Sequence, residues 1–241
     1  MKLFHIFKTE LLLIISRPTG WLAACAIFIL SGLVFQQSAI SILNQGKAIN
    51  AAGDIIFDLN TVNTIFLIFI IPIFSMKLIS SDILEGRMRL YLLTPVSRFS
   101  IVFGKFLAVV AYFFGVTALS LIYPFYISLF SEVHLLSLFT GIAGLMLYIC
   151  LLTSFSFFVS AVAKNNIVSY LVSSLTFFGF TIYTSSSQAP AWMVERLHFV
   201  GFVNPFVTGN VQVYSIVLFL ILSFSFLYLT YNSLKLSKWE A

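Results

Sequence analysis

The chain has 241 residues and a formal net charge of +5; 60% of its residues are hydrophobic and only 9% are charged. A soluble domain contains roughly 25% charged residues, and disordered chains have low hydrophobicity. The composition therefore excludes both classes and predicts a membrane protein that crosses the bilayer several times. Cys25 and Cys150 lie inside apolar runs, which argues against a disulfide framework and against a metal site.

The first predicted element is an amphipathic helix from Lys2 to Ile14. Such a helix would lie in the membrane interface with its apolar side in the acyl region. Arg17-Pro18 should end it, because proline cannot continue a helix smoothly. The helix is either a simple topological anchor or an elbow that transmits motion. Its apolar stripe contains Leu3, Phe4, Phe7, Leu11 and Ile14, and its polar stripe contains Lys2, His5, Lys8 and Thr9.

Long uncharged runs separate clusters of charged residues along the rest of the chain. Each run has room for one helix of about 20 residues that spans the hydrocarbon core. The short alternating segments of a membrane β-barrel are absent from the sequence, so we predict an all-α fold with six spans. These spans are Thr19–Phe35, Val62–Ile79, Ile101–Leu129, Leu138–Ala163, Ile167–Tyr183 and Val213–Asn232.

Three connections between the spans carry polar residues. Gln36–Thr61 is predicted to be an outer loop in which Asp54 and Asp58, four residues apart, are solvated charges on a helix face. Lys77–Lys105 contains five of the 13 basic residues. Thr184–Gln212 is too polar to span the membrane, and it should form short re-entrant helices at the outer interface. This last segment is either an interfacial belt or a gate over a translocation path.

The connection from Lys77 to Lys105 contains residues that break or cap helices. Gly86 should interrupt the helix that emerges from the second span, and Pro95 should end a short helix that follows. Ser97 or Ser100 is expected to cap the third span. A short helix of mixed charge between two spans is typical of a docking element, and the alternative is a solvated loop that only fixes orientation.

The basic residues also predict the orientation of the chain. With both termini in the cytoplasm, 11 of the 13 basic residues are cytoplasmic, and only Lys47 and Arg196 lie outside. This asymmetry satisfies the positive-inside rule. The net positive charge is therefore a topology signal, and we do not expect nucleic-acid binding.

The sequence has no recognisable catalytic motif. Gly104-Lys105 lacks the upstream glycine of a phosphate-binding loop, and no H-E-x-x-H, paired C-x-x-C or G-x-S-x-G occurs. No charged residue is predicted near the centre of a span, which weakens an ion-driven transport mechanism. We therefore expect neither catalytic residues nor a metal site in this chain. We expect the energy for its function to come from another protein.

Two motifs resemble those of the permease subunits of type-2 ABC exporters, and specifically the small gliding-motility-type branch. One is the opening Phe7-Lys-Thr-Glu10, followed by Arg17-Pro-Thr-Gly20-Trp21. The other is the loop Asp82-Ile-Leu-Glu85-Gly86-Arg-Met-Arg-Leu90-Tyr-Leu-Leu-Thr94-Pro95 with the later Gly104-Lys105. The resemblance covers nearly the whole chain.

The resemblance implies a single transmembrane domain over residues 1–241 that pairs with a second permease half, identical or related. The elbow would be 1–17, the coupling-helix loop 80–95 and the extracellular gate segment 184–212. A separate cytoplasmic ABC ATPase subunit would bind ATP and Mg²⁺, and this chain would bind no cofactor. Membrane lipid is an implied partner, an accessory periplasmic or membrane protein is a further candidate, and the implied location is a bacterial inner membrane.

The resemblance also assigns roles to residues. The ATPase-coupling interface would contain Asp82, Glu85, Gly86, Arg87, Arg89, Leu90, Tyr91 and Leu92. The elbow would use Phe4, Phe7, Lys8, Glu10 and Leu11, and the gate would use Trp192, Met193 and Phe199. Two other functions stay open: a non-transporting, ATP-driven complex that acts on partner proteins or lipoproteins, and a membrane-embedded enzyme. Net flux into sealed vesicles would favour export, and activity of the chain without an ATPase would favour an enzyme.

Overall fold

The computed structural model of the protein describes residues 2–45, 51–87, 97–120, 122–128, 135–163, 165–186 and 213–236. These residues are helical or lie in short turns, and none of them forms a strand. Six of the helical stretches are long and apolar enough to cross a membrane. For the described residues, the prediction of an all-α fold with six helices that could span a membrane is therefore confirmed.

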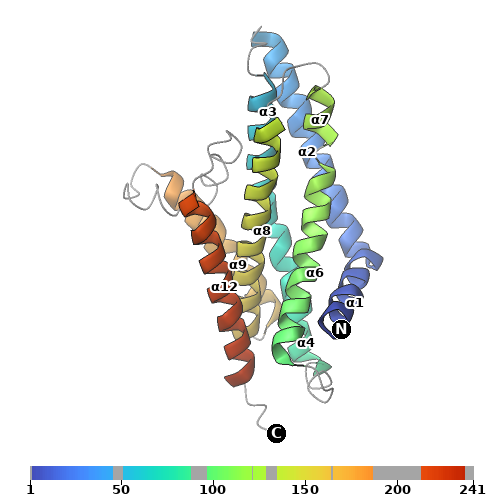
Figure 1. The fold of residues 1–241 in the computed structure, drawn as a ribbon, viewed down its shortest axis with the longest axis vertical. Helices are drawn as coiled ribbons and strands as arrows, with labels where there is room; N and C mark the ends of the chain where they lie inside the picture. The colour runs from blue at the N-terminus through green and yellow to red at the C-terminus, as the bar shows by residue number, and fades with distance from the viewer. Residues whose placement is uncertain are drawn as a thin grey trace.

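The long helices run side by side and alternate in direction, so that both chain termini lie at the same end of the bundle (Figure 1). The short helices α1 and α4 lie at this end as well. Residues Met76–Ser80 form a π-helical turn, η1, that joins α3 to α4. The helices are α1 (Lys2–Ser16), α2 (Pro18–Gln45), α3 (Ala51–Ser75), α4 (Ser81–Leu84), α6 (Arg98–Leu119), α7 (Ile122–Ser128), α8 (Leu135–Ala163), α9 (Asn166–Ser185) and α12 (Val213–Leu236).

The helix boundaries follow from capping residues and prolines. Pro18 begins α2, where its missing N–H costs nothing and its fixed φ favours the helix. The predicted break after α1 is therefore confirmed. Ser97 caps α6 by accepting a hydrogen bond from the Ser100 N–H at 3.2 Å. Asn165 caps α9 by accepting from the Ile167 N–H at 3.0 Å.

The predicted third span, Ile101–Leu129, is wrong at its C-terminal end. The structure ends α6 at Leu119, turns at Ser120 and begins the separate helix α7. Pro124 explains the break: it has no N–H to donate to the carbonyl four residues earlier, which is that of Ser120. The Tyr123 N–H donates to the Ser120 carbonyl instead, over 3.3 Å.

The predicted outer loop Gln36–Thr61 is also largely wrong, because α2 continues to Gln45 and α3 begins at Ala51. The helices extend past the apolar segments because polar side chains pair between them. Ser38 Oγ on α2 donates to Asp58 Oδ2 on α3 over 2.7 Å. Asp58 is exposed on a helix, as predicted.

The core of the bundle lies around α8, against which α3, α6, α9 and α12 pack. Phe113 of α6 and Tyr148 and Phe157 of α8 are fully buried. By contrast, α2 and α12 present large apolar side chains outward, including Trp21, which is 64% exposed. An exposed apolar surface of this extent is expected where a bilayer surrounds the protein.

A buried polar contact joins three of the spans. Ser31 Oγ on α2 donates to Asn63 Oδ1 on α3 over 2.9 Å, and Asn63 Nδ2 donates to Ser120 Oγ over 3.4 Å. Asn63 is only 4% exposed. Polar side chains that bond between membrane helices each add only modest stability, because the same groups also find partners when the helices are apart in the membrane.

We predict that Asn63→Ala lowers the free energy of unfolding in detergent by about 1 kcal/mol, because it leaves Ser31 without its acceptor. Ser225→Ala is the matched control, since Ser225 is exposed and bonds only to the Leu222 carbonyl of its own helix among its described contacts. Equal unfolding free energies for the Asn63 variant and the wild type would contradict the assigned contact.

Candidate functional site

A buried lysine lies at the end of the bundle that carries α1 and α4. The side chain of Lys105, on α6, is only 1% exposed. Its Nζ lies 2.8 Å from Glu10 Oε1 of α1 and 2.6 Å from Asp82 Oδ2 of α4. The same Nζ donates to the Leu78 carbonyl of η1 over 3.1 Å. The ammonium group of α6 therefore joins α1 to the continuous η1–α4 segment, which is far from α1 in the sequence.

The pairing offsets a large desolvation cost. An unpaired ammonium in an apolar interior is strongly unfavourable, and it becomes tolerable only with close counter-charges and hydrogen bonds. Lys105 has three N–H donors, and Glu10, Asp82 and the Leu78 carbonyl provide three acceptors. Glu10 and Asp82 are themselves 4% and 5% exposed. The three side chains therefore require one another.

A second cation extends this network to the surface. Arg87 Nε lies 2.7 Å from Asp82 Oδ1, and Arg87 Nη1 lies 2.8 Å from Glu85 Oε2. The side chains of Arg87 and Glu85 are 42% and 57% exposed. We call Glu10, Asp82, Glu85, Arg87 and Lys105 the ion-pair cluster. Its two cations and three anions form a continuous series of ion pairs from the buried interior of the bundle to an exposed turn.

The end of the second span is shaped to form this cluster. The Ser81 N–H donates to the Met76 carbonyl five residues earlier, which makes η1 a π-helical turn. Such turns often occur at functional sites. After α4, Gly86 adopts a φ of 72°, a left-handed conformation that favours glycine. The predicted helix interruption at Gly86 is confirmed, and it places Arg87 beside Asp82.

A close approach of α1 to α6 makes the Glu10–Lys105 pair possible. Gly104 lies against Ile6 of α1, and a Cβ at position 104 would be 2.9 Å from Ile6 Cγ2. That separation is too short for a non-bonded carbon contact, so a larger residue would push the two helices apart. Gly104 thus allows the close contact between the two helices, and Lys105 beside it forms the ion pair.

The structure brings together part of the residue set expected from the sequence. Asp82, Glu85, Gly86 and Arg87 share one turn, with Asp82 facing inward and Glu85 facing outward. Arg89, Leu90, Tyr91 and Leu92 lie outside the described residues, as do Trp192, Met193 and Phe199. The roles of all these residues in coupling and gating remain predictions.

The elbow residues predicted from the sequence do not share one environment. Phe4 is 66% exposed and Lys8 is exposed, whereas Phe7 and Leu11 are half-buried. Glu10 is buried and paired with Lys105. α1 is therefore held against α6 by charge as well as by its apolar stripe.

Sequence reasoning missed Lys105 as the centre of the site. A signal was available, because Lys105 follows a glycine and precedes a continuous apolar run, so that it lies on an otherwise apolar helix. Glu10 stands in a similar position before Leu11 and the apolar residues after it. Ionisable residues embedded in apolar membrane helices usually have partners, and these two are partners.

The fold and the cluster together define a multi-pass membrane protein whose described buried charges gather at one end of the bundle. The sequence matches the family described as ABC-2 family transporter protein over residues 5–217, and the chain belongs to this family. It is thus a membrane permease component of an ABC-2 type transporter, a class of subunit that works with an ATPase. Comparison with curated proteins gave no match.

We predict that Lys105→Met lowers the free energy of unfolding by about 3–5 kcal/mol, because it leaves two buried carboxylates without their cation. Denaturant titration in detergent measures the change, with Lys8→Met as the control on the exposed side of α1. Glu10→Gln should cost less, since Asp82 still faces the ammonium. A Lys105 variant as stable as the control would contradict the cluster.

Proposed function

We propose that the chain is the membrane-spanning half of an ABC exporter and that a separate cytoplasmic ATPase drives it through the segment between α4 and α6. The observation that carries this proposal is the ion-pair cluster, which ties the exposed turn at Glu85–Arg87 to buried groups on two other helices. A force applied at that turn acts directly on α1 and α6. The family implies the ATPase partner.

On this proposal, the end of the bundle that carries α1 and α4 faces the cytoplasm. The support is the basic residues, because the positive-inside rule places them there. Both termini lie at this end (Figure 1). The described basic residues of the same end are Lys2, Lys8, Arg17, Lys77, Arg87, Arg98, Lys105 and Lys235. The location is then a bacterial inner membrane.

The ATPase subunit binds ATP and Mg²⁺ and supplies the energy, and this chain contributes no hydrolytic residue. Closure of two ATPase subunits would move the turn at Glu85–Arg87. Because Asp82 is bonded to both Arg87 and Lys105, the movement passes to α6 without a flexible joint. Glu10 carries it on to α1. The spans then rock as rigid bodies, as in other alternating-access transporters.

The resemblance implies further parts of the proposed transporter. A second permease half, identical or related, would complete the path at the dimer axis. The coupling helix would continue through Arg89, Leu90, Tyr91 and Leu92. Trp192, Met193 and Phe199 would form the outer gate, where short re-entrant helices close the path.

We predict that Glu85→Lys and Arg87→Glu each reduce copurification with the ABC ATPase subunit by about tenfold, a loss of ~1.4 kcal/mol in binding. Both side chains are partly exposed, so charge reversal there changes the docking surface more than the core. The readouts are the amount of ATPase that copurifies and the ATP hydrolysis of the assembled complex.

Asp58→Lys is the matched control, because it makes the same acid-to-lysine change at an exposed position at the opposite end of the bundle, where the loss of the Ser38 bond is distant from the turn. Undiminished assembly and hydrolysis in both the Glu85 and the Arg87 variants would overturn the coupling assignment. Loss of assembly in the Asp58 variant as well would show that the effect is not local to the turn.

The direction and the cargo need a transport assay. Reconstitution of the permease with its ATPase in sealed vesicles should give ATP-dependent net movement of substrate toward the side opposite the ATPase. Hydrolysis that depends on partner proteins, with no net flux, would favour the alternative of a non-transporting complex that acts on proteins or lipoproteins.

A further inference from the structure

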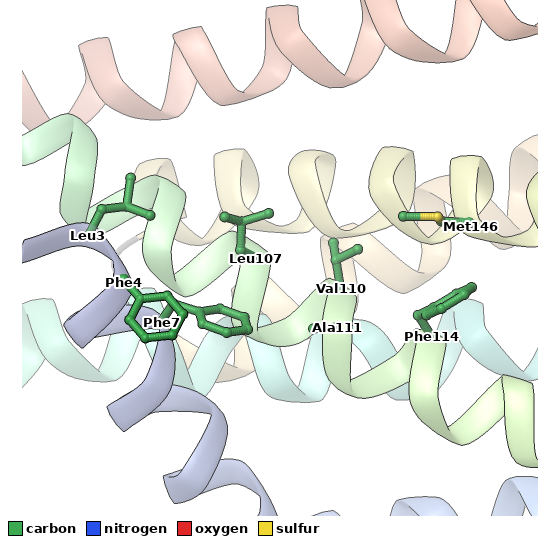
Figure 2. A pocket seen from close by; sticks show the side chains of 8 residues that line it. All are labelled: Leu3, Phe4, Phe7, Leu107, Val110, Ala111, Phe114 and Met146. Carbon is green, nitrogen blue, oxygen red and sulfur yellow. The ribbon is translucent and has the colours of Figure 1, made fainter. Parts of the chain in front are cut away.

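An apolar groove of about 350 Å³ lies between α1, α6 and α8 (Figure 2). Leu3, Phe4 and Phe7 of α1 form one end of it, and Phe114 and Met146 mark the other end. Leu107 lies between these ends on α6. From Leu107 to Phe114 the helix rises about 10 Å, so the groove is elongated along the direction of the spans.

The lining is entirely apolar: eight side chains contribute, and none of them is polar or charged. The groove is also open at its sides, since Phe4 is 66% and Met146 is 42% exposed. A polar solute would find no hydrogen-bond partner there and would lose its hydration. A flexible hydrocarbon chain is the chemical class that such a lining accepts.

The charge beside the groove is positive. Lys8 lies four residues after Phe4, and side chains at this spacing are neighbours on a helix surface. Lys8 is exposed, whereas the carboxylate of Glu10 is buried and paired with Lys105. Among the described side chains of α1, the exposed formal charge is therefore that of a lysine, which favours an anionic group at this end of the groove.

We infer that the groove holds one acyl chain of an anionic phospholipid, with the phosphate near Lys8 and the hydrocarbon running along α6 toward Met146. α1 lies at the end of the spans (Figure 1), where its amphipathic sequence predicts an interfacial helix, so a lipid with its headgroup at α1 would extend its chains toward the bilayer centre. The leaflet concerned is the cytoplasmic one, and this detail alone rests on the proposed function.

The groove differs from an ordinary lipid-facing surface because side chains of three helices form its walls. α1 contacts α6 closely at Gly104 and is fixed there by the Glu10–Lys105 pair. It therefore forms a wall that cannot drift away, and a lipid behind it exchanges more slowly than the lipids around α12. The bound lipid in turn supports the position of α1.

The test uses the full chain without any ATPase, so that failure here and failure of the coupling assignment are distinguishable. The protein is incubated with equal amounts of dioleoyl phosphatidylglycerol and dioleoyl phosphatidylethanolamine, then stripped with detergent. Native mass spectrometry counts the lipids that remain. We expect one phosphatidylglycerol per wild-type chain.

Ala111→Phe fills the groove from α6 and should reduce this retained lipid by about tenfold. Met146→Trp is the second variant, at a more exposed position that tolerates bulk, and it should act in the same way. Val217→Phe adds a ring to the 47% exposed surface of α12 and serves as the size-matched control. Lys8→Gln should abolish the preference for phosphatidylglycerol while acyl binding persists.

Retention of lipid by folded Ala111→Phe and Met146→Trp proteins at the wild-type level would overturn the inference. Equal loss from the Val217→Phe control would do so too, because the lipid would then be merely annular. A change in oligomeric mass in the groove variants, without a change in lipid count, would assign the groove to a second copy of the chain instead.

Discussion

The structure depends on one buried charge. Lys105 can lie inside an apolar bundle only because Glu10 and Asp82 approach it within hydrogen-bond distance, and each carboxylate is tolerated there only because of the lysine. The three residues come from α1, α4 and α6. Their mutual requirement holds α1 and the end of the second span against the third.

The same constraint gives the proposed mechanism its physical basis. Solvent exposure of the charged groups rises from the buried ammonium of Lys105, through Asp82, to the exposed turn at Glu85 and Arg87. A partner that binds this turn contacts the bundle interior through two ion pairs in series. Movement of the turn therefore moves α6 and α1 together. The apolar groove beside Phe7 lies against the same two helices, so the proposed lipid and the proposed ATPase would act on them from different sides.

The sequence predicted the architecture well where local chemistry decides it. Uncharged runs of sufficient length predicted the six spans, Pro18 and Gly86 predicted two of the interruptions, and Ser97 was one of two expected caps. The break between α6 and α7 was missed, because the run is apolar throughout and only Pro124 indicates it. The extension of α2 and α3 past the apolar segments was missed because it depends on contacts between helices.

The site was predicted in its parts but not as a whole. Asp82, Glu85 and Arg87 were expected in one loop and Glu10 in the elbow, yet nothing in their spacing pairs Glu10 with a lysine 95 positions later. Tertiary packing at Gly104 makes that pair. A long-range ion pair of this kind follows from the three-dimensional approach of two helices, which a single sequence does not encode in any local pattern.

The most direct measurement uses the triple variant Glu10→Gln, Asp82→Asn, Lys105→Met in complex with the ABC ATPase subunit. Removing all three charges leaves none unpaired, so the variant should fold with a stability close to that of the wild type. The ATP hydrolysis of the ATPase subunit in this complex should no longer be coupled to the permease, because the Glu85–Arg87 turn has lost its buried ion pairs. A well-folded triple variant with wild-type coupled hydrolysis would contradict the account.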